Sequence, residues 1–179
     1  MDVIGSVLNE ITEVVKKVKI EDMEHFISLI NREKRIFVDG EGRSGLMAKG
    51  FAMRLMHLGY TVYVIGETIT PSLNKGDLFI AISGSGESEG VLIDTKKAKK
   101  KDCKVLVVTS KEDSSIAKLS EHILIIPGTT KAQSGEKRNS IQLLSSLFDQ
   151  SLHIVLDILC LLISIRDQTS NEEATNQHW

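Results

Sequence analysis

The sequence predicts an α/β fold of three layers, in which helices cover both faces of a doubly wound, five-stranded parallel sheet. Five short runs rich in β-branched residues alternate with stretches of helical periodicity, as parallel strands joined by right-handed crossovers do. Four of these runs are almost continuously apolar, which is typical of strands covered on both faces. The length of 179 residues, 41% of them hydrophobic, suits one well-packed domain.

The predicted elements follow in order along the chain. Apolar residues recur every three to four positions through residues 1–34, which predicts two N-terminal helices. The α/β core with its closing helix is expected over 35–166, and a polar, frayed tail over 167–179. The predicted strands are residues 35–39, 61–65, 78–82, 104–109 and 122–126. The predicted helices of the core are residues 44–58, 88–101, 113–120 and 140–166.

Charge and cysteine content exclude several classes of partner. The formal net charge is −2, from 22 basic and 24 acidic residues mixed along the chain, so we expect no nucleic-acid partner. The basic run over residues 96–101 has helical spacing and is interpreted as a solvated helix face. Cys103 and Cys160 lack the spacing of a metal site or a redox pair. We therefore expect buried free thiols and no bound metal.

The sequence predicts a cytoplasmic protein with no membrane partner. Its first residues are amphipathic and include acidic side chains, unlike a secretion signal. Free thiols also suit a reducing compartment. The most apolar stretch, residues 152–165, carries His153 and Asp157 and is interpreted as a buried helix that is too short to span a bilayer.

Two glycine-rich loops follow the first and third predicted strands, where parallel sheets bind their ligands. The first contains Gly40, Gly42 and Gly45 in the spacing G-x-G-x-x-G, between a strand and a helix. Dinucleotide-binding folds have this spacing, and Glu67 lies slightly beyond the second strand, near where such folds hold a ribose hydroxyl. A NAD site is therefore one interpretation, although two polar residues stand where dinucleotide turns usually carry small or apolar ones.

The second loop, with the sequence ISGSGES, favours a phosphate ligand. It places the hydroxyls of Ser83, Ser85 and Ser88 between a buried strand and a helix. Hydroxyls and backbone amides at a helix N-terminus bind phosphate oxygens, and Gly84 and Gly86 let the backbone approach the anion. The alternative is that Ser88 only caps the helix and the glycines only turn the chain. Since no metal motif accompanies the loop, we expect a phosphorylated sugar.

Four stretches resemble the 6-phospho-3-hexuloisomerases, which are members of the sugar isomerase (SIS) domain family: residues 40–59, 66–71, 76–88 and 146–150. The segment FAMRLMHLG within the first stretch is the most specific part of this resemblance. It implies a flavodoxin-like SIS fold and an isomerase without a cofactor, interconverting 3-hexulose 6-phosphate and fructose 6-phosphate in the ribulose monophosphate pathway. It also implies a homotetramer, with 3-hexulose-6-phosphate synthase as the functional partner.

The resemblance implies roles for individual side chains. Asp149 stands where the family has the glutamate that moves a proton between sugar carbons, and is expected to be the catalytic base. The alternative is that Asp149 is an ordinary acidic residue in the first turn of a helix, stabilised by the helix dipole. His57 is expected to assist from a neighbouring subunit, or else only to favour its helix C-terminus. Glu87 either contacts substrate or orients its loop. The expected substrate-binding residues are Gly40, Gly42, Arg43, Ser44, Ser83, Gly84, Ser85, Gly86, Glu87 and Ser88.

The chain departs from the family pattern towards its C-terminus. The side chain of Asp149 is one methylene shorter than glutamate, and a displacement of about 1 Å can cost on the order of a hundredfold in rate. The Pro-Met-Gly run before the motif and the His-x-Asn-Leu ending of the family are also missing from the sequence. A sugar-phosphate-binding module without turnover is therefore the second candidate function, and a NAD-linked enzyme is the third.

Overall fold

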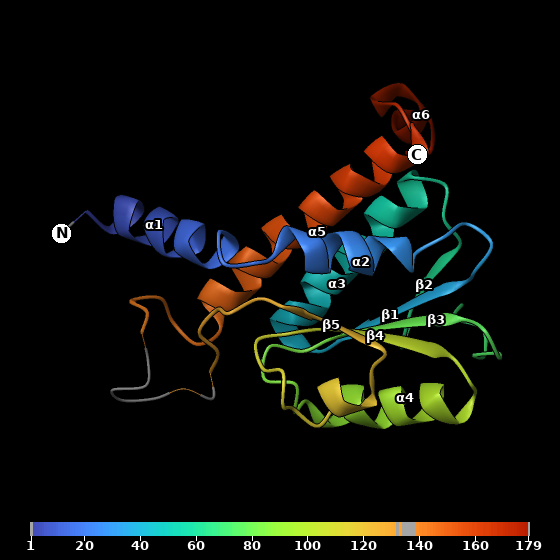
Figure 1. The fold of residues 1–179 in the computed structure, drawn as a ribbon, viewed down its shortest axis with the longest axis horizontal. Helices are drawn as coiled ribbons and strands as arrows, with labels where there is room; N and C mark the ends of the chain where they lie inside the picture. The colour runs from blue at the N-terminus through green and yellow to red at the C-terminus, as the bar shows by residue number, and fades with distance from the viewer. Residues whose placement is uncertain (1, 132, 134–138, 179) are drawn as a thin grey trace.

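The computed structural model describes residues 2–131, 133 and 139–178. At its centre lies a five-stranded parallel sheet with the strand order β2-β1-β3-β4-β5, which is the flavodoxin-like order. Figure 1 shows α1, α2, α3 and α5 on one face of this sheet and α4 on the other. The predicted class of a three-layer, doubly wound α/β fold is confirmed.

All five strands lie within one residue of their predicted bounds: β1 Ile36–Gly40, β2 Val62–Val64, β3 Leu78–Ile82, β4 Lys104–Thr109 and β5 His122–Ile125. Successive side chains of a strand point to opposite faces. Val38 and Ile80 therefore pack into the core under α3 and α5, whereas Phe37 and Phe79 pack into the core under α4. Both faces of the central strands are thus buried, as their continuously apolar sequence predicts.

Four helices cover one face of the sheet: α1 Val3–Val15, α2 Ile20–Ser28, α3 Gly42–His57 and α5 Ser146–Asp167. Helices α3 and α5 lie side by side and run in the same direction. Their first turns meet through Ser44 and Asp149, and their last turns both line one cavity, through His57 and Asp167. Both helices therefore begin at the carboxyl edge of the sheet.

The other face is covered by α4 Glu89–Lys100 and the short 3₁₀ helix η1 Ala117–Leu119. The lysines along the basic run are exposed while Ala98 is buried, which confirms a solvated helix face. The helix predicted over 113–120 is reduced to η1. The backbone N–H of Ile116 donates to the carbonyl of Gly86 at 3.1 Å, so this segment is tied to the second glycine loop.

Two expectations for the C-terminal region are wrong. Helix α5 has 22 residues and, among the described residues, is the one helix long and apolar enough to cross a membrane, so the length argument for 152–165 fails. Half of its most apolar stretch is nevertheless buried in the protein. The tail is not frayed, because residues Asn171–Asn176 form helix α6, started by a capping box between Ser170 and Glu173.

Candidate active site

A cavity of about 370 Å³ lies beyond the carboxyl ends of β1 and β3, where open parallel sheets hold their ligands. Its lining comes from the first glycine loop, the second glycine loop, residues 130–131 after β5, and residues 144–149 at the start of α5. Seven predicted site residues line it: Gly42, Arg43, Ser44, Gly84, Ser85, Ser88 and Asp149. The remaining lining residues are Glu41, Thr130, Lys131, Leu144, Ser145 and Ser146.

The second glycine loop is held in shape by its own hydroxyls. The Oγ atoms of Ser83 and Ser88 lie 2.9 Å apart, and the backbone N–H of Gly86 donates to Ser83 Oγ at 3.1 Å. Ser88 occupies the N-cap position of α4, but its side chain accepts no hydrogen bond from that helix. The interpretation of Ser88 as a simple cap is therefore wrong, and the first amides of α4 are left to bind another acceptor.

Close packing accounts for the first glycine loop. A Cβ atom on Gly45 would lie 2.5 Å from the carbonyl oxygen of Gly40, so this pair lets α3 start directly against the end of β1. Glu67, the acidic residue of the NAD interpretation, forms an ion pair with Lys49, with 2.6 Å between Oε1 and Nζ. Neither feature requires a dinucleotide.

Asp149 is the buried carboxylate of the cavity, with 2% of its surface exposed. Ser44 Oγ donates to Asp149 Oδ1 at 2.6 Å, and Arg43 Nη1 donates to Ser146 Oγ at 2.8 Å in the same first turns. Burial raises the pKa of Asp149, while the hydrogen bond from Ser44 and the positive charge of Arg43 act in the opposite direction. These opposed influences are how proteins tune a carboxylate for proton transfer near neutral pH.

Five of the twelve predicted site residues do not line this cavity, and His57 and Glu87 are two of them. His57 ends α3, roughly 20 Å along the helix from Ser44 at 1.5 Å per residue. It is 4% exposed and its ring lies 5.2 Å from that of His178; burial, then the charge of Arg54, lowers its pKa. Glu87 Oε1 accepts a hydrogen bond from the backbone N–H of Ser115 at 2.8 Å, which lowers the pKa of this carboxyl. Glu87 thus ties the second glycine loop to the loop after β4.

Gly40, Ser83 and Gly86 also lie behind the cavity lining and shape the loops that form it. Gly86 has a φ of +67°, and a Cβ atom there would lie 2.0 Å from Ser114 Oγ. A side chain at this position would therefore displace the second loop. These three residues support the lining without facing the ligand space.

Thr130 is a site residue that sequence reasoning missed. It is 1% exposed, and its Oγ1 has no hydrogen-bond partner among the described residues. A buried hydroxyl left unpaired costs about 1–3 kcal/mol, and a ligand hydroxyl or phosphate oxygen would satisfy it. Lys131 follows it and donates its backbone N–H to Ser145 Oγ at 2.9 Å. The only signal in the sequence is the polar composition of the segment after the fifth strand.

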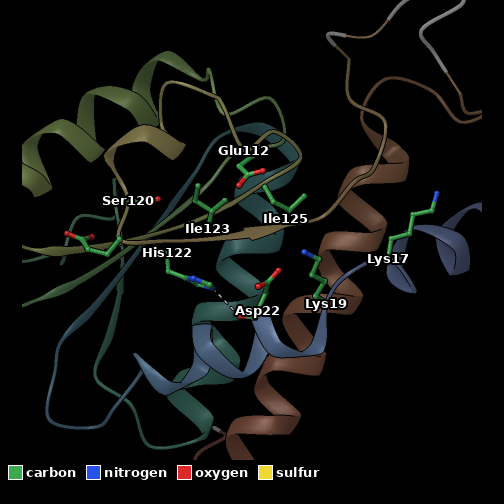
Figure 2. Close-up of a pocket in the computed structure, with 9 residues that line it drawn as sticks. Lys17, Lys19, Asp22, Glu112, Ser120, His122, Ile123 and Ile125 are labelled. Atoms are coloured by element: carbon green, nitrogen blue, oxygen red, sulfur yellow. Dashed lines mark hydrogen bonds between the residues drawn. The ribbon is translucent and has the colours of Figure 1, made fainter.

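A larger cavity, of about 470 Å³, lies beside the edge strand β5. Figure 2 shows the residues that line it. Lys17 and Lys19 approach it from the connection between α1 and α2, and Asp22 and Glu112 contribute opposite charges. His122 lies between β5 and α2, with Nε2 3.0 Å from the carbonyl oxygen of Asp22. Neither glycine loop reaches this cavity, so we place the candidate site at the smaller one.

Comparison with known proteins connects this site to one family. The model of the SIS domain matches residues 29–154. The 3-hexulose-6-phosphate isomerase of Bacillus subtilis is 37% identical over 175 residues, which cover 98% of this chain and 95% of that protein. The corresponding isomerase of Mycobacterium gastri is 36% identical over 172 residues, covering 96% of this chain and 86% of that protein.

A solved structure gives the same result. A Methanococcus jannaschii protein, for which a 3-hexulose-6-phosphate isomerase function was inferred from its crystal structure, superposes with a TM-score of 0.85. It is 31% identical in sequence, and the match covers 100% of this chain and 98% of that one. The fold and the sequence comparisons therefore indicate the same family.

Proposed function

The chain belongs to the SIS domain family and is an isomerase, and we propose that it interconverts D-arabino-hex-3-ulose 6-phosphate and D-fructose 6-phosphate through an enediol, without a cofactor. The observation that carries the proposal is one cavity that combines serine hydroxyls at a helix N-terminus with a buried carboxylate. Ser85 and Ser88 lie at its α4 side and Asp149 at the start of α5. This combination suits a substrate with a phosphate at one end and an acidic C–H at the other.

The carboxylate of Asp149 would remove the proton from C2 of the 3-ketose. The electron pair forms the C2=C3 bond while the C3 carbonyl oxygen takes a proton. Asp149 then returns its proton to C3, the O2 hydroxyl releases its own, and C2=O forms, so no atom is gained or lost. Ser44 supports this shuttle because its hydrogen bond fixes one carboxylate oxygen at 2.6 Å and leaves the other for the substrate.

A coupled assay tests this proposal. Ribulose 5-phosphate and formaldehyde are supplied with a hexulose-phosphate synthase, and fructose 6-phosphate is measured after this protein is added. Formation of fructose 6-phosphate is the expected result. Tight binding of fructose 6-phosphate without turnover would instead favour the second candidate, a sugar-phosphate sensor. The observation that favours this candidate is the side chain of Asp149, which is one methylene shorter than the glutamate of the family. A thermal shift with NAD but not with fructose 6-phosphate would indicate a dehydrogenase.

The proposal extends to the setting of the reaction. We place it in the ribulose monophosphate pathway, for formaldehyde assimilation or detoxification in the cytoplasm, with 3-hexulose-6-phosphate synthase as the functional partner. No nucleic acid or membrane is part of it.

We also propose a homotetramer, because α3 and α5 expose apolar side chains along adjacent stripes. Leu46 and Met53 on α3 are 62% and 48% exposed, and Leu161 and Ile165 on α5 are 59% and 65% exposed. Stripes of this kind are expected to be covered by another subunit. His57 lies at the end of α3, and assembly through this face is the route by which it would reach the site of a neighbouring subunit.

A further inference from the structure

The side chain of Glu41 crosses from one glycine loop to the helix that follows the other. Glu41 occupies the N-cap position of α3, but its side chain accepts no hydrogen bond from that helix. Its carboxylate lies against α4 instead, because a Cβ atom on Gly90 would be only 2.1 Å from Glu41 Oε1. The absence of a side chain at Gly90, the second residue of α4, is what leaves room for this carboxylate.

We expect the phosphate group of the substrate to bind at this N-terminal end of α4. Ser88 does not cap the helix, and no described side chain accepts a hydrogen bond from the backbone N–H of Glu89, Gly90 or Val91. The partial positive charge of a helix N-terminus stabilises any anion placed there. The carboxylate of Glu41 is such an anion, and it shares the cavity with Ser88.

An independent feature indicates that the cavity takes a polar ligand. Thr130 contributes to its lining and is 1% exposed, and its Oγ1 has no partner among the described residues. Glu41 is exposed to solvent, so its flexible side chain can swing away from α4 at little cost when such a ligand arrives.

We propose that Glu41 competes with the phosphate group of the substrate for the same binding site. Its carboxylate occupies the N-terminal end of α4 in the free protein and is displaced when a phosphate monoester binds. This inference rests on the proposed function, since it places the phosphate group of the same substrate at the N-terminal end of α4. Competition of this kind weakens the binding of substrate and product alike. It therefore favours product release, which limits turnover in many enzymes.

Isothermal titration of the full chain with fructose 6-phosphate and with inorganic phosphate, at low ionic strength, tests the proposal. We expect Glu41→Gln to lower both dissociation constants about fivefold and Glu41→Ala at least as much, because a charge at a helix terminus has an effect of this order. The matched control is Glu89→Gln. It removes one exposed carboxylate from the first turn of the same helix, but outside the cavity, and is expected to change affinity less than twofold. Added salt should reduce the difference between wild type and Glu41→Gln.

Several outcomes would overturn the inference. Affinities of Glu41→Gln and Glu41→Ala equal to or weaker than wild type would do so, as would equal tightening by Glu89→Gln, or binding of neither anion by any variant. The coupled isomerase assay on the wild-type protein keeps the two proposals apart. Tightening in an inactive protein would leave Glu41 as the competitor and remove the isomerase, whereas an active protein without tightening would remove only the competitor.

Discussion

The hydrogen bond from Ser44 Oγ to Asp149 Oδ1 is 2.6 Å long and joins two residues that are 105 positions apart in the sequence. It connects the first turns of two parallel helices, α3 and α5. Ser44 lies in the first turn of α3, directly after the first glycine loop leaves β1, and Asp149 lies in the first turn of the closing helix α5. The proposed base is therefore oriented by the same loop that lines the substrate cavity. A change in either first turn is expected to alter the protonation of Asp149.

Ser44→Ala is expected to raise the pKa of Asp149, because the lost hydrogen bond is an influence that lowers it. The proposed base works in its deprotonated form, so the acid limb of the pH profile of kcat should move to higher pH. The measurement is kcat against pH in the coupled assay. Ser85→Ala removes a hydroxyl from the phosphate loop of the same cavity, and should raise KM while leaving the limb in place. If the acid limb of the pH profile of kcat does not shift in Ser44→Ala, the predicted effect of Ser44 on the pKa of Asp149 is wrong.

Asp149→Asn is expected to abolish turnover, with a loss of at least about a hundredfold, while the affinity for fructose 6-phosphate stays near that of wild type. The amide retains the size of the side chain but cannot accept a proton from carbon. Kinetics and calorimetric titration on one preparation check both halves. Full activity in Asp149→Asn would remove the base assignment.

Asp39 is expected to make stability depend on pH. It is 6% exposed, and burial, followed by the charge of Asp94, raises its pKa to about 6. Between pH 4 and 6 the folded chain keeps a proton that the unfolded chain releases, so raising the pH favours unfolding. The free energy of unfolding of wild type, relative to Asp39→Asn, should fall by up to about 3 kcal/mol from pH 4 to pH 7. Urea titrations that give a constant difference would contradict it.

Gly45→Ala is expected to destabilise the protein although alanine is the better helix former. Propensity alone would stabilise the variant by about 1 kcal/mol. The new Cβ atom, however, would lie 2.5 Å from the carbonyl oxygen of Gly40, which is backbone and cannot rotate away. Chemical denaturation decides between the two effects by the sign of the change.

Leu161→Glu is expected to dissociate the proposed oligomer. The side chain is 59% exposed on the outer face of α5, and a buried carboxylate there would be unpaired. Light scattering gives the mass. Ile93→Glu serves as the control, since Ile93 is 46% exposed on α4, on the opposite layer. A monomeric wild type, or an unchanged mass for Leu161→Glu, would contradict the assembly through this face.

The sheet could be predicted from the sequence because its signals are local. Strand β3 is an uninterrupted apolar run and lies at the predicted residues 78–82, and the other four strands deviate by at most one residue. Element ends set by contacts were harder to predict. The segment over 113–120 forms only the short helix η1, and its Ile116 N–H donates to the carbonyl of Gly86 instead of continuing a helix. The capping box of Ser170 and Glu173 is a local signal, but the polar composition of the tail made it easy to miss.

Part of the candidate site could likewise be predicted from the sequence, and part could not. Both glycine loops and Asp149 lie in one cavity, as expected from loops that follow neighbouring parallel strands. Thr130 and Lys131 reach it because the chain turns back across the sheet edge after β5, and Glu41 because it extends towards Gly90. These placements depend on tertiary packing, which no spacing in the sequence encodes.

The two halves of the cavity belong to opposite layers of the sheet. The phosphate loop leads into α4 on one face, and Asp149 starts α5 on the other. On the proposed function, the sheet edge between them would therefore set the distance between the reacting carbon and the phosphate group of the substrate. Sugars with fewer or more carbons between these two groups would bind by their phosphate but present the wrong carbon to the carboxylate. On the proposed function, the site would therefore select its substrates by chain length.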